Sequence, residues 1–136
     1  MIRVALAAIV LLLPGAAAAQ AIDEYSGAET FERYCASCHG GGGTGDGPVA
    51  AAIPIPVPDL TRLEARDGDA FDEDLLHKII DGREPVIYHG TRYMPVWGYE
   101  FWVEEGADVD AQERVDIIVR NLVDYIRTIQ REEPAG

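Results

Sequence analysis

The stretch Cys35-Ala36-Ser37-Cys38-His39 decides how the rest of this chain is interpreted. Two thiols three positions apart, with a histidine directly after the second, are the pattern of a covalent haem attachment site. The two cysteines can form thioethers to one porphyrin edge, and the histidine can then donate an axial nitrogen to the iron. The chain has 2 cysteines in all, so the motif predicts one covalently bound haem c.

Two other interpretations of the motif fit the sequence less well. A redox disulfide with Cys-x-x-Cys spacing is expected near a strand-helix-strand pattern, and no strand pattern precedes Cys35. A zinc site needs further cysteine or histidine ligands at finger-like spacing. Only His77 and His89 remain, and both are far from the motif. Haem attachment is therefore the preferred interpretation.

Residues 1–19 have the layout of a secretory signal peptide, because Arg3 precedes an apolar run that ends in a series of alanines. The uncharged run is shorter than the ~20 apolar residues that a membrane span requires. We therefore expect cleavage after Ala19 or Ala21, one domain over residues 20–136 and no membrane span in the mature chain. Export and covalent haem together predict location in a bacterial periplasm.

The chain is strongly acidic, with 24 acidic against 11 basic side chains and a formal net charge of −13. Such a field repels nucleic acid and anionic membrane surfaces, and it can steer a basic protein surface toward the chain. We therefore expect no nucleic-acid partner, and redox proteins that dock through basic surfaces. Acidity also keeps a protein soluble, so charge alone does not identify the donor or the acceptor.

Apolar periodicity predicts three helices separated by loops. They cover Asp23–Tyr34, Phe71–Gly82 and Val109–Ile129. Ser26 and Asp72 are suited to cap the first two helices, and Asp110 with Glu113 makes a capping box at the start of the third. His77 falls off the apolar stripe of the second helix, so we expect it to be exposed.

The segments between these helices predict loops of different kinds. Residues 40–47 hold six glycines but lack the lysine of a phosphate-binding loop, so we expect them to bring backbone close to the haem face. Residues 50–61 alternate proline with apolar side chains, which predicts extended chain that lines the haem pocket. Residues 64–69 are predicted to be a solvated loop, and residues 84–102 a loop-rich aromatic segment.

Met94 is the only methionine apart from the initiator, and Pro95 follows it. A lone methionine usually fills a gap in a core. Before a proline in a loop, however, it suits a thioether aimed at a metal, because proline disfavours helix at the preceding residue. Its distance in sequence from His39 allows the chain to pass around the haem and reach the other face. His89 is the competing sixth ligand.

The haem motif, the glycine loop ending at Pro48, the pair Met94-Pro95 and a last helix with Leu122 and Tyr125 together resemble class I c-type cytochromes. The resemblance implies a compact all-α fold, the class I cytochrome c fold, in which the N- and C-terminal helices cross. The residues that it implies at this crossing are Gly27, Phe31, Leu122 and Tyr125.

The resemblance also implies a set of roles at the iron. His39 and Met94 would be the axial ligands, and the carbonyl of Pro48 would accept a hydrogen bond from the second nitrogen of His39. Iron held on both sides has no open position for a substrate. The implied function is one-electron transfer between redox proteins by a periplasmic mono-haem cytochrome that is not itself an enzyme.

Two alternatives remain open from the sequence. The chain could be the haem-bearing electron-transfer subunit of a periplasmic dehydrogenase or oxidase complex, and an exposed aromatic patch over Trp97–Trp102 would favour this reading. Less consistent is a haem ligand sensor or peroxidase, which needs an open or weakly held sixth position. Rapid binding of carbon monoxide by the ferrous protein would favour that reading.

Overall fold

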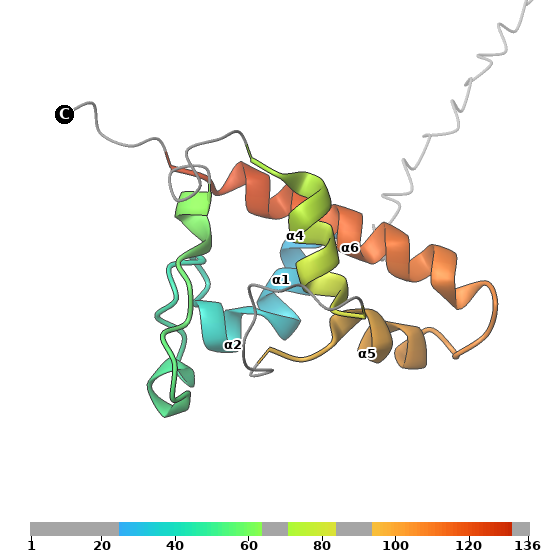
Figure 1. Ribbon diagram of the computed structural model, residues 1–136, viewed down its shortest axis with the longest axis horizontal. Coiled ribbons are helices and arrows are strands. Elements are labelled where there is room, and N and C mark those ends of the chain that lie inside the picture. Colours follow the sequence, from blue (N-terminus) through green and yellow to red (C-terminus); the bar gives the residue numbers. More distant parts are fainter. Residues whose placement is uncertain (1–24, 64–70, 84–93, 132–136) are drawn as a thin grey trace, which may run out of the picture.

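The computed structural model describes residues 25–63, 71–83 and 94–131, and these ranges fold into helices joined by loops (Figure 1). The helices are α1 (Gly27–Tyr34), α2 (Ala36–His39), η1 (Ala50–Ala52), η2 (Leu60–Arg62), α4 (Glu73–Asp81), α5 (Trp97–Glu104) and α6 (Ala111–Thr128). The described ranges contain no strand, so the predicted all-α class is confirmed. The predicted signal peptide, the predicted loop over 64–69 and His89 lie outside these ranges.

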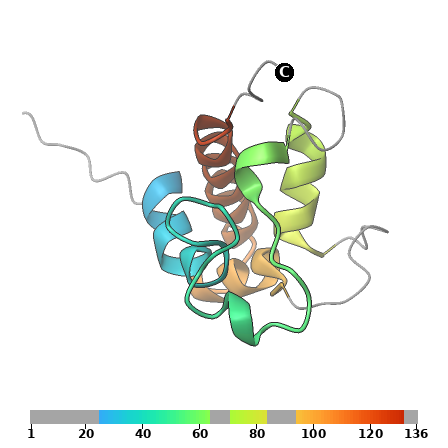
Figure 2. The same ribbon diagram turned by 90° about the vertical axis from the view of Figure 1, so that its left-hand side faces the viewer.

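Helix α6 is the central helix, and α1, α4 and α5 all pack against it (Figures 1 and 2). One of its faces is apolar over its whole length, so burying that face supplies much of the core. The buried residues of α6 are Ala111, Val115, Ile118, Val119, Leu122, Val123 and Ile126. In the part of the chain that the structure describes, no helix is long and apolar enough to cross a membrane.

At the crossing of α1 and α6 the two helix backbones lie close together. A Cβ atom on Gly27 would overlap the carbonyl oxygen of Asn121 and would lie 3.0 Å from the Cβ of Tyr125. Phe31 is completely buried, and its ring centroid lies 5.1 Å from that of Tyr125. Leu122 is buried in the same core cluster. The predicted crossing of the first and last helices is therefore confirmed.

The caps of α1 and α4 are those that the sequence predicts. The Oγ of Ser26 accepts a hydrogen bond from the backbone N–H of Glu29 at 3.5 Å. The carboxylate of Asp72 accepts one from the N–H of Leu75 at 2.9 Å. Helix α4 ends at Gly82, whose φ of 67° is the left-handed conformation that glycine adopts without strain.

The predicted capping box of α6 is wrong. Asp110 makes no side-chain capping hydrogen bond, because its backbone is already helical, at φ −81° and ψ −21°. Instead, the carboxylate of Asp108 accepts the hydrogen bond from the N–H of Ala111 at 2.7 Å. The cap is thus supplied from the loop, two residues earlier than predicted.

The segment predicted as a loop-rich aromatic stretch contains a helix, α5. Trp97 and Phe101 are four residues apart, so they lie on one face of the helix, where Phe101 is buried and Trp97 is half-buried. Packing of this face against the core favours a helix that weak periodicity did not predict. One smaller difference is that His77, which is predicted to be exposed, is half-buried.

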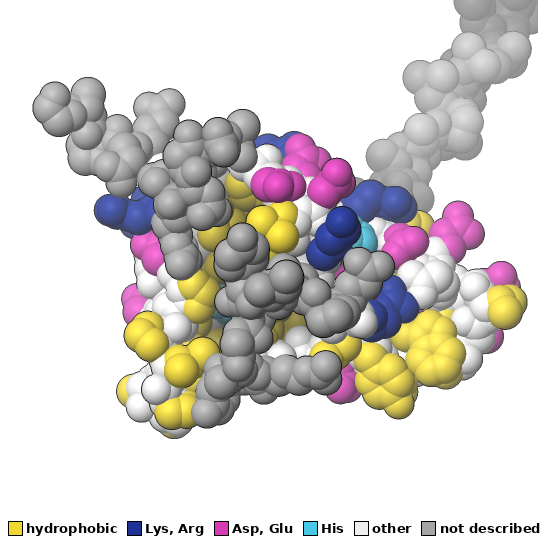
Figure 3. Space-filling model, viewed as in Figure 1, with side chains coloured by type: hydrophobic (Ala, Val, Ile, Leu, Met, Phe, Trp, Pro, Cys, Tyr) yellow, Lys and Arg dark blue, Asp and Glu magenta, His cyan; other side chains and the backbone are white. Residues whose placement is uncertain are grey.

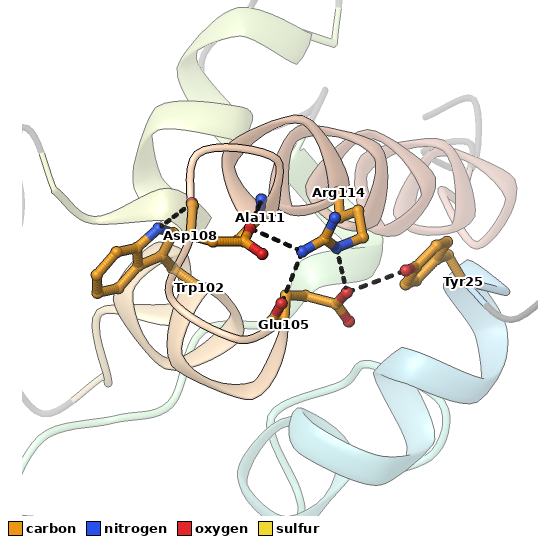
Figure 4. Close-up of polar contacts among 6 residues, drawn as sticks. All are labelled: Tyr25, Trp102, Glu105, Asp108, Ala111 and Arg114. Atoms are coloured by element: carbon orange, nitrogen blue, oxygen red, sulfur yellow. Dashed lines mark hydrogen bonds and ion pairs between the residues drawn. The ribbon is translucent and has the colours of Figure 1, made fainter.

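A polar network ties the loop between α5 and α6 to the start of α1 (Figure 4). Arg114 donates to the carboxylate of Glu105 at 2.8 Å, to its carbonyl at 2.7 Å and to the carboxylate of Asp108 at 3.1 Å. The hydroxyl of Tyr25 donates to the same Glu105 carboxylate at 3.1 Å. The indole N–H of Trp102 donates to the carbonyl of Asp108 at 3.2 Å.

Candidate haem-binding site

The motif forms a single helical turn at the end of α1. The backbone N–H groups of Cys38 and His39 both donate to the carbonyl of Cys35, at 3.1 and 2.9 Å. Residues three and four apart lie on the same side of a helical turn. Cys35, Cys38 and His39 therefore share one face, and all three are half-buried.

His39 is oriented by a backbone carbonyl. Its Nδ1 lies 3.3 Å from the oxygen of Pro58. A carbonyl can only accept, so Nδ1 carries the hydrogen and Nε2 keeps the lone pair that a metal ligand needs. Burial lowers the pKa of His39, against the smaller raising effect of the hydrogen bond to Pro58. The ring is therefore neutral at neutral pH, as ligation requires.

The sequence predicts Pro48 as this acceptor, and the structure places Pro58 there instead. Residues 47–49 run along the backbone of α2, where Gly47 N–H donates to the carbonyl of Cys38 at 3.1 Å and Val49 N–H donates to that of Ser37 at 3.0 Å. Pro48 is consequently exposed. The chain passes through η1 before it returns to the imidazole ring with Pro58.

The glycine-rich loop brings backbone close to backbone. Gly45 has φ 81°, and a Cβ there would overlap the carbonyl oxygen of Val57 and lie 3.3 Å from that of Pro58. A Cβ on Gly47 would lie 2.6 Å from the carbonyl oxygen of Cys38. The close approach that the glycines allow is thus to α2 and to the proline segment. The predicted approach to a haem face stays a prediction.

The electrostatics of Cys35 oppose a redox role. Burial, with a smaller contribution from Cys38, raises the pKa of the Cys35 thiol to about 12. Redox-active Cys-x-x-Cys pairs instead have a lowered thiol pKa, because the thiolate is the reactive form. The described ranges contain no group of three or more His, Cys, Asp and Glu side chains that could hold a metal ion.

Met94 lies three residues before α5 and is half-buried. It packs against the same core cluster as Cys35, whereas Pro95 beside it is exposed. Met94 and Cys35 thus both border one core cluster, and the role of Met94 as an iron ligand stays a prediction. The competing ligand, His89, falls outside the described residues.

An aromatic cluster joins α5 to the residue before Cys35. The ring of Tyr34 lies 5.5 Å from Trp97 and 5.2 Å from Phe101, with edge-on geometry in both pairs. Its hydroxyl donates to the carboxylate of Glu104 at 2.5 Å. Sequence reasoning missed this cluster. The spacing of Trp97, Phe101 and Glu104 places the three on one helix face, but it does not identify Tyr34 as their partner.

Residues 23–111 match the sequence model of a known family, described as cytochrome C oxidase, cbb3-type, subunit III. The match covers more than half of the chain. The chain belongs to this family. The predicted c-type cytochrome is thereby confirmed, and with it electron transfer by a haem c protein. Most of α6 lies beyond the matched residues. Neither a curated protein nor a solved structure matches the chain of this cytochrome.

The side chains of the cytochrome fit the cofactor that its family implies. Two thiols and a neutral imidazole share one face of a helical turn, and the Nε2 of His39 is left unprotonated by the contact with Pro58. A thioether is a soft donor that suits iron in its reduced form. Cys35, Cys38 and His39 would therefore hold a covalently bound haem, and Met94 would offer it a soft sulfur donor.

Proposed function

We propose that this cytochrome is a mono-haem electron carrier whose iron is held by His39 and Met94. Cys35 and Cys38 would anchor the haem, and the 2 cysteines of the chain allow one such attachment. When bound, the haem supplies a ferric/ferrous couple that takes one electron from a reduced donor and passes one to an oxidised acceptor. The observation that carries this proposal is the contact of His39 Nδ1 with the Pro58 carbonyl, which leaves Nε2 for the metal.

The ligand pair explains why the protein would carry electrons rather than transform a substrate. Held by both His39 and Met94, the iron would keep no coordination position for a substrate. The same two ligands would serve both oxidation states, so little would have to move when the charge changes. The soft sulfur of Met94 would favour the reduced state and raise the potential. The role of the protein is to bind, orient and bury the cofactor.

The proposed place of action is the periplasm. The basic, apolar and alanine-rich order of residues 1–19 supports export, and thioether cytochromes are completed outside the cytoplasm. The net charge of −13 supports docking to donors and acceptors through basic surfaces. N-terminal sequencing of the protein purified from periplasm would test the cleavage site, with a new terminus at Gln20 or Ile22 expected.

The optical spectrum of the ferric protein, made in a host that attaches haem, tests the ligand assignment. We expect the weak far-red absorption that coordination of sulfur to ferric iron produces. If the haem is attached and this band is missing, a nitrogen ligand or an open position replaces Met94. Rapid binding of carbon monoxide by the ferrous protein would then select a sensor or peroxidase.

A second candidate, a subunit held permanently in an oxidoreductase complex, is favoured by one surface. Apolar side chains gather where α5 lies (Figure 3). Tyr99 is 54% exposed and Val103 47% exposed, and the ring of half-buried Trp102 lies 6.2 Å from that of Tyr99. Glu100 and Glu104 are exposed on the same helix. An exposed apolar patch with acidic neighbours is typical of a protein-binding site.

Purification of the tagged cytochrome from its native periplasm distinguishes the two candidates. A free carrier elutes from size exclusion at the mass of a single chain. A permanent subunit elutes with a larger protein, and the double change of Tyr99 and Val103 to serine releases it. The same change at the exposed residues Val49 and Ile55, which lie outside α5, is the control.

A further inference from the structure

We propose that Gln130, just beyond the end of α6, is a positioning residue for the Pro58 carbonyl and, through it, for His39. The inference rests on the proposed role of His39 as an axial ligand. By this proposal Gln130 influences the reduction potential of the haem, although it lies outside residues 23–111, which match the family model.

The side chain of Gln130 bridges α6 and η2 with both ends of its amide. Its Nε2 donates to the carbonyl of Leu60 at 2.7 Å and to that of Ile126 at 2.9 Å. Its Oε1 accepts from the backbone N–H of Leu63 at 3.0 Å. Gln130 therefore holds both sides of the η2 turn, which begins two residues after Pro58.

Neighbouring hydrogen bonds make this attachment rigid. The N–H of Arg131 donates to the carbonyl of Thr61 at 2.8 Å. Thr61 is 1% exposed, and its N–H and hydroxyl both donate to the carboxylate of Asp59, at 2.8 and 2.7 Å. Both ribbon views place η2 beside the C-terminal end of α6 (Figures 1 and 2). Movement of α6 at this end would therefore move Asp59 and the carbonyl next to it.

The glycine-rich loop holds Pro58 from the other side. The N–H of Leu60 donates to the carbonyl of Gly43 at 2.7 Å, and the N–H of Gly45 donates to the carbonyl of His39 at 2.8 Å. Gly45 also packs directly against the backbone of Pro58. The loop belongs to the same sequence segment as His39, so it moves with the ligand. Gln130 is the side chain that fixes Pro58 to the helical core.

The physical consequence concerns the basicity of the axial imidazole. A carbonyl that accepts the Nδ1 hydrogen makes the ring a stronger donor, which stabilises the ferric state. Without the anchor at Gln130, the η2 turn gains freedom and the contact between Pro58 and His39 weakens. The ring then donates less, so the reduction potential moves to more positive values. The Nδ1 hydrogen also exchanges with solvent more often.

The test compares the haem-loaded wild type with Gln130→Leu, Gln130→Glu and the control Gln112→Leu. Leucine removes every hydrogen bond of the side chain. Glutamate keeps an acceptor for Leu63 but loses the donor to Leu60. Gln112 is a half-buried glutamine near the other end of α6, where it accepts from Arg83 and donates to Asp116.

Two quantities are measured, the reduction potential and the exchange rate of the His39 Nδ1 hydrogen in the ferrous state by NMR. For both Gln130 variants we expect a more positive potential and exchange about fivefold faster, which corresponds to weakening the contact between His39 Nδ1 and Pro58 by about the free energy of one ordinary hydrogen bond. Gln112→Leu should leave both quantities at the wild-type values. Unchanged potential and exchange in the Gln130 variants, or equal changes in Gln112→Leu, would overturn the proposal.

Failure of the inference can be told apart from failure of the proposed function. The far-red band and the Nδ1 resonance of the wild type first establish whether Met94 and His39 hold the iron. Only then are the variants compared, each after thermal unfolding has shown that it is folded at the temperature of measurement. If Gln130→Leu does not fold, Gln130→Glu, which keeps the bond from Leu63, decides the question.

Discussion

Gly27 in α1 and Asn121 in α6 approach so closely that no side chain fits between the two backbones. The side chain of Asn121 adds a hydrogen bond from its Nδ2 to the carbonyl of Tyr25 at 2.7 Å. This crossing fixes the start of α1 against α6. Because Cys35 directly follows α1, the crossing also fixes where the haem motif is presented.

Gly27→Ala should destabilise the haem-loaded protein, although alanine is the better helix former. The gain in helix propensity is about 1 kcal/mol, whereas a Cβ that overlaps the Asn121 carbonyl forces α1 and α6 apart. We expect a net loss of about 1–2 kcal/mol in the free energy of unfolding, within the usual cost of overpacking. Denaturant titration measures it. Gly42→Ala is the control, since a Cβ at Gly42 meets nothing within 4 Å.

Tyr34→Phe should cost little, whereas Tyr34→Ala should cost much more. The hydrogen bond to Glu104 is exposed, so its loss is expected to cost about 0.5–1 kcal/mol. Alanine removes in addition the ring contacts with Trp97 and Phe101, which are worth about 0.5–1.5 kcal/mol each beyond the area that they bury. Equal losses for the two variants in denaturant titration would show that the hydroxyl dominates.

Because Asp108 titrates in the acidic range, the stability of the loop before α6 should change with pH in that range. The hydrogen bond from the N–H of Ala111, followed by that from Arg114, lowers the pKa of this carboxyl. A lowered pKa in the folded state contributes stability above the unfolded value, near pH 4, and that contribution disappears as the pH falls through the folded value. Asp108→Asn should therefore flatten this part of the profile of melting temperature against pH.

Asp110→Asn is the matched control for Asp108. It carries the same change two residues later, at a side chain that makes no capping hydrogen bond. Its pH profile should follow the wild type. The opposite result, a flattened profile for Asp110→Asn alone, would restore Asp110 as the cap of α6.

Met94→Ala should retain covalently attached haem, because Cys35, Cys38 and His39 are unchanged. We expect the far-red band to disappear, carbon monoxide to bind the ferrous protein rapidly, and the potential to fall because the soft sulfur donor is lost. His89→Ala is the comparison, and it should resemble the wild type. If the two variants exchange these behaviours, His89 is the sixth ligand.

Patterns that depend on near neighbours could be predicted from the sequence. The caps at Ser26 and Asp72, the stop at Gly82 and the long apolar face of α6 each follow from interactions within one turn or along one helix face. The haem motif is also such a local pattern, because one helical turn brings its two thiols and its imidazole together. The glycine at the α1–α6 crossing was predicted from the resemblance to cytochromes.

Other features depended on how distant segments meet. Whether Pro48 or Pro58 faces His39 is decided by the path of the chain through η1, because Gly47 and its neighbours are bound along α2. Helix α5 forms where Trp97 and Phe101 find Tyr34 to pack against, a partner some sixty positions away in the sequence. Gln130 reaches η2 across a similar separation. Neither local propensity nor spacing specifies such contacts, because they stabilise the protein only after the distant segments have packed together.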